Sequence, residues 1–203
     1  MKTSAIILAG GFSKRFGRDK GLIELAGKPL ITHVLDRVSK VVNETLIVVS
    51  SEDQKDAFTT PARSKTKVVT DKYSLRSPVV GALTGFEKAL GEYSLLLPCD
   101  TPFVSKEISS LLLDLCVGRS AVIPRWPNRY IEPLHAAYHT KSALNASETA
   151  YKEKKLDLRS MIANLRGVRY VSTLVLQQID PKLMTFFNVN TPEDLKKAES
   201  MMK

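Results

Sequence analysis

ILAGGFSKRFGRDKGL, residues 7–22, decides the fold of this 203-residue chain and poses its first chemical question. A short apolar run ends at Ala9, two glycines follow, and four cations then surround a third glycine, Gly17. In open α/β sheets anions bind beyond the carboxyl ends of strands, where backbone N–H groups converge. Glycine suits such a loop because a side chain would block a phosphate and because these loops use positive φ. The stretch therefore predicts a phosphate-binding loop that follows a buried strand.

The glycine spacing differs from that of the two common phosphate loops. A dinucleotide fingerprint needs G-x-G-x-x-G, and a P-loop needs G-x-x-x-x-G-K-[ST]. A bare pair of glycines is more often a plain turn with solvated basic residues around it. The full string L-A-G-G-x-S-x-R-x-G-x-D-K, residues 8–20, favours a phosphate loop of a different kind.

Short β-branched runs alternate with segments of helical period along the chain. The predicted strands are 4–9, 45–50, 67–70, 94–98, 120–124 and 186–190. The predicted helices are 29–42, with Pro29 in its first turn, 79–91, 105–118 after a Ser105 cap, and one that follows a Thr191 cap. This alternation predicts an α/β fold, a Rossmann-like three-layer sandwich with a mostly parallel central sheet.

Residues 125–180 interrupt that alternation. They contain WPNRYIEP, two predicted helices within 140–166 and a short strand near 168–173, while 131–138 alternates imperfectly and is compatible with a strand. We interpret residues 1–203 as a single domain in which 125–180 form an insertion at the functional edge of the sheet.

The net charge of +9 indicates a polyanionic partner. Because the cations are spread along the chain and no segment carries a known RNA-binding or zinc-finger signature, small phosphorylated ligands are favoured over nucleic acid.

The uncharged apolar stretches are shorter than the roughly 20 residues of a membrane span, and the apolar start runs straight into the glycines, so we expect a cytoplasmic protein without a signal peptide. Cys99 and Cys116 are expected to be reduced, packed thiols.

Two aspartates follow predicted strands. Asp100 is the first carboxylate after SLLLP, and Asp71 closes KVVTD, so both are expected at the edge that carries Gly10. Mg²⁺ that accompanies a nucleotide takes one or two carboxylates plus phosphate oxygens and water, so Asp100 is a sufficient metal ligand. The alternative is that either residue only begins a turn. His135 and His139 lack the glutamate and third ligand of a zinc site.

The quoted motifs together resemble the nucleotidyltransferases that activate a phosphorylated acceptor, and most closely the molybdenum cofactor guanylyltransferases, the molybdopterin-guanine dinucleotide biosynthesis protein A family. The shared strings are the glycine-rich signature, CDTP at 99–102, P-x-x-G at 78–81, EPL-x-A-x-Y at 132–138 and NVNTP at 188–192. The resemblance implies a nucleotide-diphospho-sugar transferase-like fold with residues 125–180 on the acceptor side. It also implies that GMP passes from GTP to the terminal phosphate of molybdopterin, molybdenum-loaded, with release of pyrophosphate.

The resemblance assigns roles to individual residues. The catalytic set comprises Arg15, Lys20 and Asp100, with Mg²⁺ on Asp100. The nucleotide-binding set comprises Leu8, Ala9, Gly10, Gly11, Lys20, Asp71, Gly81, Asp100, Asn188 and Asn190. Plain turn roles for Asn188 and Asn190 remain equally open. Arg125, Arg129 and Glu132 are candidate acceptor contacts, and transient contacts with molybdopterin-loading proteins or apo-molybdoenzymes are further partner expectations.

Several alternatives stay open at this point. Related cytidylyltransferases typically read LAAG where this chain reads LAGG, which favours guanine over cytosine. A sister enzyme that uses CTP, or GTP with a cobalamin-precursor or sugar-phosphate acceptor, is the nearest alternative. A non-catalytic nucleotide-binding protein that delivers a cofactor is the alternative from another class. The combination of Asp100, Lys20 and Arg15 argues against that adaptor because an adaptor needs no metal-binding acid.

Overall fold

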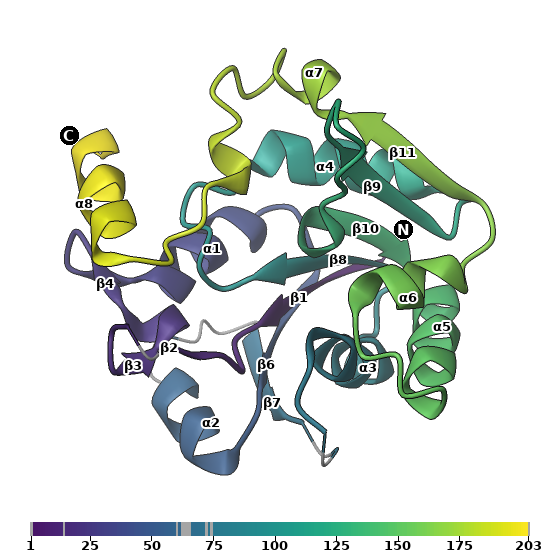
Figure 1. Cartoon of the computed structure of the whole chain (residues 1–203), viewed down its shortest axis with the longest axis horizontal. Coiled ribbons are helices and arrows are strands. Elements are labelled where there is room, and N and C mark those ends of the chain that lie inside the picture. The colour runs from purple at the N-terminus through teal and green to yellow at the C-terminus, as the bar shows by residue number, and fades with distance from the viewer. Residues whose placement is uncertain are drawn as a thin grey trace.

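A seven-stranded sheet forms the centre of the computed structural model (Figure 1). The structure describes residues 2–13, 15–59, 61, 66–71, 73 and 75–202, apart from the side chains of Phe12 and Ser13. The strand order is β11-β9-β10-β8-β1-β6-β7. The strands are β1 (Thr3–Leu8), β6 (Glu44–Val49), β7 (Thr66–Thr70), β8 (Tyr93–Pro98), β9 (Ala121–Arg125), β10 (Ala136–His139) and β11 (Val168–Ser172). Two small hairpins pair β2 (Phe12–Ser13) with β3 (Arg18–Asp19) and β4 (Glu24–Leu25) with β5 (Lys28–Pro29).

All neighbouring strands of the large sheet are parallel except β10, which runs antiparallel to both β8 and β9. In the centre, Ile6 of β1 lies opposite Leu46 of β6 and Leu96 of β8, and all three side chains are fully buried. Both faces of such strands are covered, which explains why their sequences are continuous apolar runs. The six parallel strands place their carboxyl ends at one edge of the sheet.

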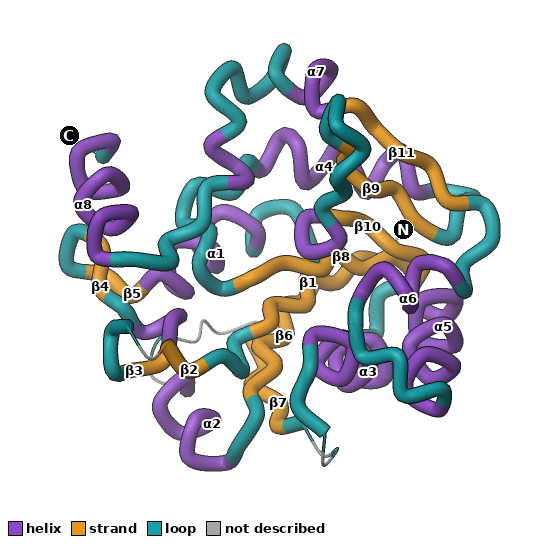
Figure 2. Tube along the Cα trace, in the orientation of Figure 1, coloured by secondary structure: helices purple, strands orange, loops and turns teal. Residues whose placement is uncertain are grey.

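Helices cover both faces of the sheet, as Figures 1 and 2 show. One face packs against α1 (Leu30–Val38), α2 (Glu52–Thr59) and α4 (Lys106–Cys116). The other packs against α3 (Pro78–Lys88), α5 (Thr140–Lys152) and α6 (Leu158–Ala163). The remaining helical segments are η1 (Lys20–Leu22), η2 (Pro133–His135), α7 (Thr173–Leu176), η3 (Met184–Phe186) and α8 (Pro192–Met201). The predicted three-layer sandwich with a mostly parallel sheet is confirmed.

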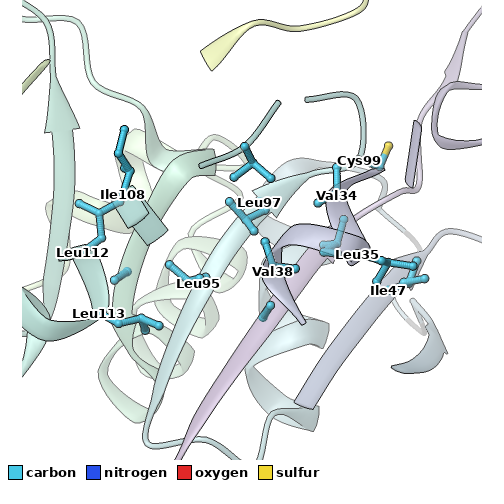
Figure 3. Close-up of a cluster of buried hydrophobic side chains, with 14 of the residues drawn as sticks. Val34, Leu35, Val38, Ile47, Leu95, Leu97, Cys99, Ile108, Leu112 and Leu113 are labelled. Atoms are coloured by element: carbon cyan, nitrogen blue, oxygen red, sulfur yellow. The ribbon is translucent and has the colours of Figure 1, made fainter. Parts of the chain in front are cut away.

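The larger core cluster joins the sheet to α1 and α4. Figure 3 shows Leu95 and Leu97 of β8 between Leu35 of α1 and Leu112 of α4, and all four side chains are at most 2% exposed. Full burial of one such side chain contributes roughly 1.5–3 kcal/mol to folding. Cys99 and Cys116 are free and buried in the same cluster, and burial raises the pKa of the Cys116 thiol to about 12. The expectation of packed thiols is confirmed.

Two predicted helix caps are present. Ser105 Oγ accepts a hydrogen bond from the Ile108 amide at the start of α4. Thr191 Oγ1 accepts from the Asp194 amide while the Asp194 carboxylate accepts from the Thr191 amide, which is a complete capping box at the start of α8. Pro29, predicted in the first helical turn, instead ends β5 and precedes α1 with an extended backbone.

The prediction of a strand over 186–190 is wrong. This segment contains the end of η3 and then runs as a loop, in which a backbone amide and a side-chain amide form hydrogen bonds outside any ladder. The Val189 amide donates to the Asp100 carbonyl, 2.9 Å away, and the Asn188 side-chain amide donates to the Phe186 carbonyl. The strand that pairs with β8 on this side of the sheet is β10 instead. This confirms the strand reading for residues 136–138 within 131–138.

The sequence does not predict helix α2, because EDQKDAFT has little apolar periodicity. Phe58 is the buried residue of this helix. Its first turn carries Glu52 and Asp53, which interact favourably with the positive end of the helix dipole.

Within 125–180 the two helices and the strand are present as α5, α6 and β11. The single-domain reading and the acceptor-side role of this segment stay predictions. No helix among the described residues is long and apolar enough to cross a membrane.

Candidate functional site

Four neighbouring strands deliver the candidate site residues to one edge of the sheet. In the order β8-β1-β6-β7, these strands are followed by Asp100, Gly10, Ser50 and Asp71. Because the strands are parallel, the loops that follow them lie side by side in the same order. The edge therefore combines a buried acid at one end with a glycine turn at the centre.

A cavity of about 290 Å³ opens at the glycine turn, and we call it the glycine cavity. Its lining comes from the ends of β1, β6 and β7, from the start of α3 and from η2. The lining residues are Leu8, Gly10, Gly11, Val48, Val49, Ser50, Asp71, Arg76, Ser77, Pro78, Gly81 and Leu134. Five residues expected to bind nucleotide, namely Leu8, Gly10, Gly11, Asp71 and Gly81, are thus brought together.

Two glycines in this lining allow a close approach of neighbouring segments. A Cβ on Gly10 would lie 3.2 Å from Ser50 Cβ, and a Cβ on Gly81 would lie 3.3 Å from Leu8 Cδ2. The Ser50 hydroxyl also donates to the Gly10 carbonyl, 3.0 Å away, which ties the loop after β1 to the end of β6. Gly11 has open space where its Cβ would stand. The lining is therefore narrow at Gly10 and open at Gly11.

Asp71 is held in a fixed orientation at the cavity wall. Its amide donates to the Val49 carbonyl, and its Oδ1 accepts from Thr84 Oγ1, 2.9 Å away, and from the Tyr73 amide. These bonds leave Asp71 Oδ2 as the carboxylate oxygen without a hydrogen bond to the described residues. Asp71 therefore has the turn role and, among the described residues, a second carboxylate oxygen that is open to a ligand.

The signature loop folds back as the β2–β3 hairpin. Gly17 at its tip has φ +64°, a conformation that favours glycine, and the Lys20 amide donates to the Gly11 carbonyl. Gln54 of α2 donates to Asp19 Oδ1 and accepts from the Ser50 amide. Helix α2 thus fixes the hairpin relative to β6, which determines where Lys20 emerges.

Lys20 connects two segments that are far apart in the sequence. Its Nζ lies 3.3 Å from Asp100 Oδ2 and donates to Asn190 Oδ1, 2.7 Å away. The Asp100 carbonyl accepts from the Val189 amide, which brings the NVNTP segment to the same point. The lysine of the signature, the aspartate of CDTP and an asparagine of NVNTP therefore form one cluster.

Asp100 is an unusually buried carboxylate, with 7% of the residue exposed. Burial raises the pKa of its carboxyl group, and the attraction of the Lys20 ammonium opposes that shift. A carboxylate that is largely removed from water binds a cation more strongly than an exposed one does because the local dielectric constant is low. Asp100 is therefore suited to attract a cation.

A second cavity, of about 400 Å³, contains Asp100 and is called the Asp100 cavity. Glu132 and Asn188 also line it, and burial raises the pKa of the Glu132 carboxyl group while a hydrogen bond from Trp126 Nε1 opposes the rise. Pro78 and Leu134 line this cavity and the glycine cavity alike. The two cavities therefore adjoin, as a donor and an acceptor of a transferred group require.

Six predicted residues line neither cavity, and two of them, Lys20 and Asn190, are hydrogen-bonded to each other beside Asp100. The Ala9 amide already donates to the Val48 carbonyl, and Ala9 is fully buried, so its amide is not available to a ligand. Arg15 is exposed on the hairpin and lines neither cavity. Arg125 and Arg129 line a separate groove beside the Asp100 cavity, whereas Glu132 lines the cavity itself. Lys14 of the signature lies outside the described residues.

Sequence reasoning missed the residues that support the site. Ser50 ends the predicted strand TLIVVS, so its place at the carboxyl edge was a usable signal. Thr84 and Gln54 carried no comparable signal because their partners, Asp71 and Asp19, are reached only through the packing of α3 and α2. Arg76 also lines the glycine cavity and adds a cation to it.

The oxygen donors around Asp100 fit a magnesium ion. Mg²⁺ prefers oxygen ligands and keeps phosphate oxygens and water in its shell, so one carboxylate with nearby amide oxygens is enough. Asp100 supplies the carboxylate, and Asn188 lines the same cavity. Among the residues that the structure describes, no group of three or more His, Cys, Asp and Glu side chains is placed to hold a metal.

Comparison with known proteins bears on this arrangement. Residues 5–168 match the family described as the MobA-like NTP transferase domain. A protein from Methanosarcina mazei named "probable molybdenum cofactor guanylyltransferase" is 34% identical over 198 residues, which are 95% of this chain and 88% of the relative. The molybdenum cofactor guanylyltransferase of Desulfosudis oleivorans is 30% identical over 201 residues, 98% of this chain and 96% of its own.

A solved structure shows the same architecture. The crystal structure of molybdopterin-guanine dinucleotide biosynthesis protein A from Archaeoglobus fulgidus superposes with a TM-score of 0.83 at 28% identity and covers 98% of both chains. The resemblance inferred from the sequence motifs is thereby confirmed. The family match spans the strands that Gly10, Asp71 and Asp100 follow at one edge of the sheet. The chain therefore belongs to the MobA-like NTP transferase family.

Proposed function

We propose that this protein transfers GMP from GTP to the terminal phosphate of molybdopterin, molybdenum-loaded, and releases pyrophosphate. The observation that carries the proposal is that the glycine cavity adjoins the cavity that contains Asp100, the carboxylate to which Lys20 of the signature loop is bonded. The names of the relatives point to the same reaction. The glycine cavity would take the nucleotide, and the Asp100 cavity would take the acceptor.

In this reaction an oxygen of the acceptor phosphate attacks the α-phosphorus of GTP. The bond between that phosphorus and the bridging oxygen toward the β-phosphate breaks, and pyrophosphate carries away the electron pair. The acceptor is already an anionic nucleophile, so the protein needs no strong general base. Catalysis therefore rests on holding two anions together and on neutralising their charge.

Several residues of this chain would share that work. The backbone around Gly10 and Gly11 and Asp71 Oδ2 would contact the nucleotide, and Lys20 would neutralise triphosphate charge. Arg15 would have to approach from the exposed hairpin. Asp100 would hold Mg²⁺, with amide oxygens of Asn188 or Asn190 near it. When bound, Mg²⁺ supplies charge neutralisation for the triphosphate and the leaving pyrophosphate.

The direct test is pyrophosphate release by the purified protein with GTP, CTP or ATP, each with and without molybdenum-loaded molybdopterin, in Mg²⁺ and again in excess chelator. We expect release with GTP, only when the pterin is present and only with Mg²⁺. Release with CTP in place of GTP would assign the chain to the cytidylyl-transferring sister reaction. Tight GTP binding without release under every condition would favour the adaptor or a different acceptor.

A further inference from the structure

A groove lined by arginines lies beside the Asp100 cavity and has no role in the proposed chemistry. It has a volume of about 510 Å³ and runs between β9, β11 and α6. Three exposed arginines, Arg125, Arg129 and Arg159, line it. Within the part of the chain that the structure describes, none of the three forms an ion pair. The groove therefore presents three positive charges that no described acidic side chain pairs with.

Two of the arginines pack on tyrosine rings, and the backbone of the third is fixed, before any partner binds. The guanidinium of Arg125 lies 4.9 Å from the centre of the Tyr170 ring, and that of Arg159 lies 5.3 Å from the centre of the Tyr130 ring. Such cation–π contacts favour these side-chain positions at exposed sites. Arg129 has φ +69°, and its amide donates to the Trp126 carbonyl. A preformed array loses less entropy on binding than a flexible one does.

The loop that carries Arg129 is itself firmly closed. The Trp126 amide donates to the Tyr130 carbonyl, the Glu132 amide donates to the Pro124 carbonyl, and Trp126 Nε1 donates to Glu132 Oε1. Glu132 lines the Asp100 cavity, so this loop forms the wall between that cavity and the groove. An occupant of the groove would thus sit next to the proposed acceptor site without entering it.

We propose that this groove binds an acidic segment of a partner protein. The floor between the arginines is aliphatic, with Ile131, Ile162, Leu165 and Val168, and a lone phosphate would leave it uncovered. Carboxylate side chains pair with guanidinium groups in bidentate geometry, while apolar side chains of the same segment cover the floor. This inference goes beyond nucleotidyl transfer and does not depend on which nucleotide the protein uses.

A single-stranded nucleic acid fits the groove less well. Such ligands bind when their bases stack on free aromatic faces between basic residues. Here Tyr130 and Tyr170 are 50% and 40% exposed, but each ring already carries a guanidinium on its face. The positive charge attracts both polyanions, whereas the aliphatic floor favours the polypeptide.

The test measures binding of a fluorescein-labelled peptide of repeating Glu-Glu-Leu units by anisotropy, with a Lys-Lys-Leu peptide for comparison. The variant Arg125→Gln/Arg129→Gln/Arg159→Gln removes the groove charges. The matched control Arg37→Gln/Lys40→Gln/Lys106→Gln removes the same net charge from exposed residues elsewhere. Circular dichroism and the melting temperature verify that both variants are folded.

We expect the groove variant to weaken binding of the acidic peptide about tenfold or more, the control to change it less than about twofold, and the basic peptide not to bind. Backbone amide resonances of Val168 and Ile131 should shift on titration. Equal losses in both variants would reveal attraction by net charge alone and overturn the proposal. Stronger competition by single-stranded RNA or by pyrophosphate than by the acidic peptide would also overturn it. If pyrophosphate release failed while the peptide still bound through the groove, only the proposed function would fall.

Discussion

Replacement of Asp100 by asparagine should have opposite effects on activity and on stability. The substitution keeps the shape of the side chain and removes its charge. Asp100 is buried beside Lys20, and burial, more than its partner, governs the pKa of its carboxyl group. We therefore expect D100N to lose turnover and to gain free energy of unfolding at neutral pH.

The loss of turnover follows from charge neutralisation. Under the proposed function Asp100 is the carboxylate that holds Mg²⁺ against the triphosphate, and an amide is a much weaker ligand for a hard cation. We expect a decrease in kcat on the order of 10³-fold, which corresponds to about 4 kcal/mol of barrier. Saturating Mg²⁺ should not restore the rate.

The gain in stability follows from the sign of the pKa shift. The pKa of Asp100 in the folded protein lies above its unfolded value of about 3.9, so the folded state binds its proton more tightly. At pH values below the unfolded pKa the carboxyl group is protonated in both states, so its ionisation does not change the free energy of unfolding. Between the unfolded and the folded pKa the free energy of unfolding falls as pH rises, and above the folded pKa the loss is constant. D100N removes this cost but leaves the Lys20 ammonium, whose side chain is 30% exposed, without its carboxylate partner, so we expect a net gain of no more than about 1 kcal/mol. In a chain of this length that corresponds to roughly 2–4 °C in melting temperature.

The assay combines pyrophosphate release with thermal melts at a series of pH values. The control is D114N, in which an exposed aspartate of α4 undergoes the same substitution, and it should leave both quantities unchanged. Near-full turnover of D100N would refute the metal assignment. A variant that melts well below the wild type across the whole pH range would show that Asp100 stabilises the fold through its charge, contrary to the burial argument.

Three further substitutions probe the supporting structure. Gly85→Ala should lower the free energy of unfolding by about 1–2 kcal/mol in urea melts because its Cβ would overlap the side chain of Ile6, and a drop below a few tenths would contradict the tight packing of α3 on β1. Asp71→Asn should raise the Kd for GTP about tenfold in calorimetry, since a carboxylate oxygen not bonded to Thr84 is lost. Unchanged affinity would leave Asp71 a purely structural residue. Thr191→Ala should cost about 1 kcal/mol of stability in thermal melts and lower kcat/KM several-fold, and an unaltered kcat/KM would separate the cap from the site.

Much of the sheet could be predicted from the sequence because its strands are buried on both faces and read as continuous apolar runs. The same reasoning placed Gly10, Asp71 and Asp100 at one edge, since parallel strands share their carboxyl ends. It was wrong about 186–190, where the apolar letters of FFNVN belong to a loop that bonds to the Asp100 carbonyl rather than to a strand partner. An apolar run identifies burial, but its hydrogen-bond partners depend on segments far away in the chain.

The supporting residues escaped prediction for a related physical reason. The link from Ser50 through Gln54 to Asp19 uses a helix with little apolar periodicity, which is positioned by its packing against β6 and β7. The availability of the Ala9 amide likewise depended on its partner, the Val48 carbonyl, which only the pairing of β1 with β6 supplies. Motifs specify which residue types meet, whereas tertiary packing determines which of their polar groups remain free.

The site itself is assembled from segments that meet only in the complete fold. Lys20 bonds Asp100 across 80 positions of the sequence and Asn190 across 170 positions. The Asn190 amide is in turn fixed by Asp194 of the α8 capping box, and α8 packs beside β4. Docking of the C-terminal helix therefore supplies one of the two hydrogen-bond acceptors that hold the signature lysine in place. The cluster of Lys20, Asp100 and Asn190 is held by contacts between segments that are distant in the sequence. Loss of the α8 cap should therefore lower the reaction rate by displacing Lys20, even though no atom of α8 lines the glycine cavity or the Asp100 cavity.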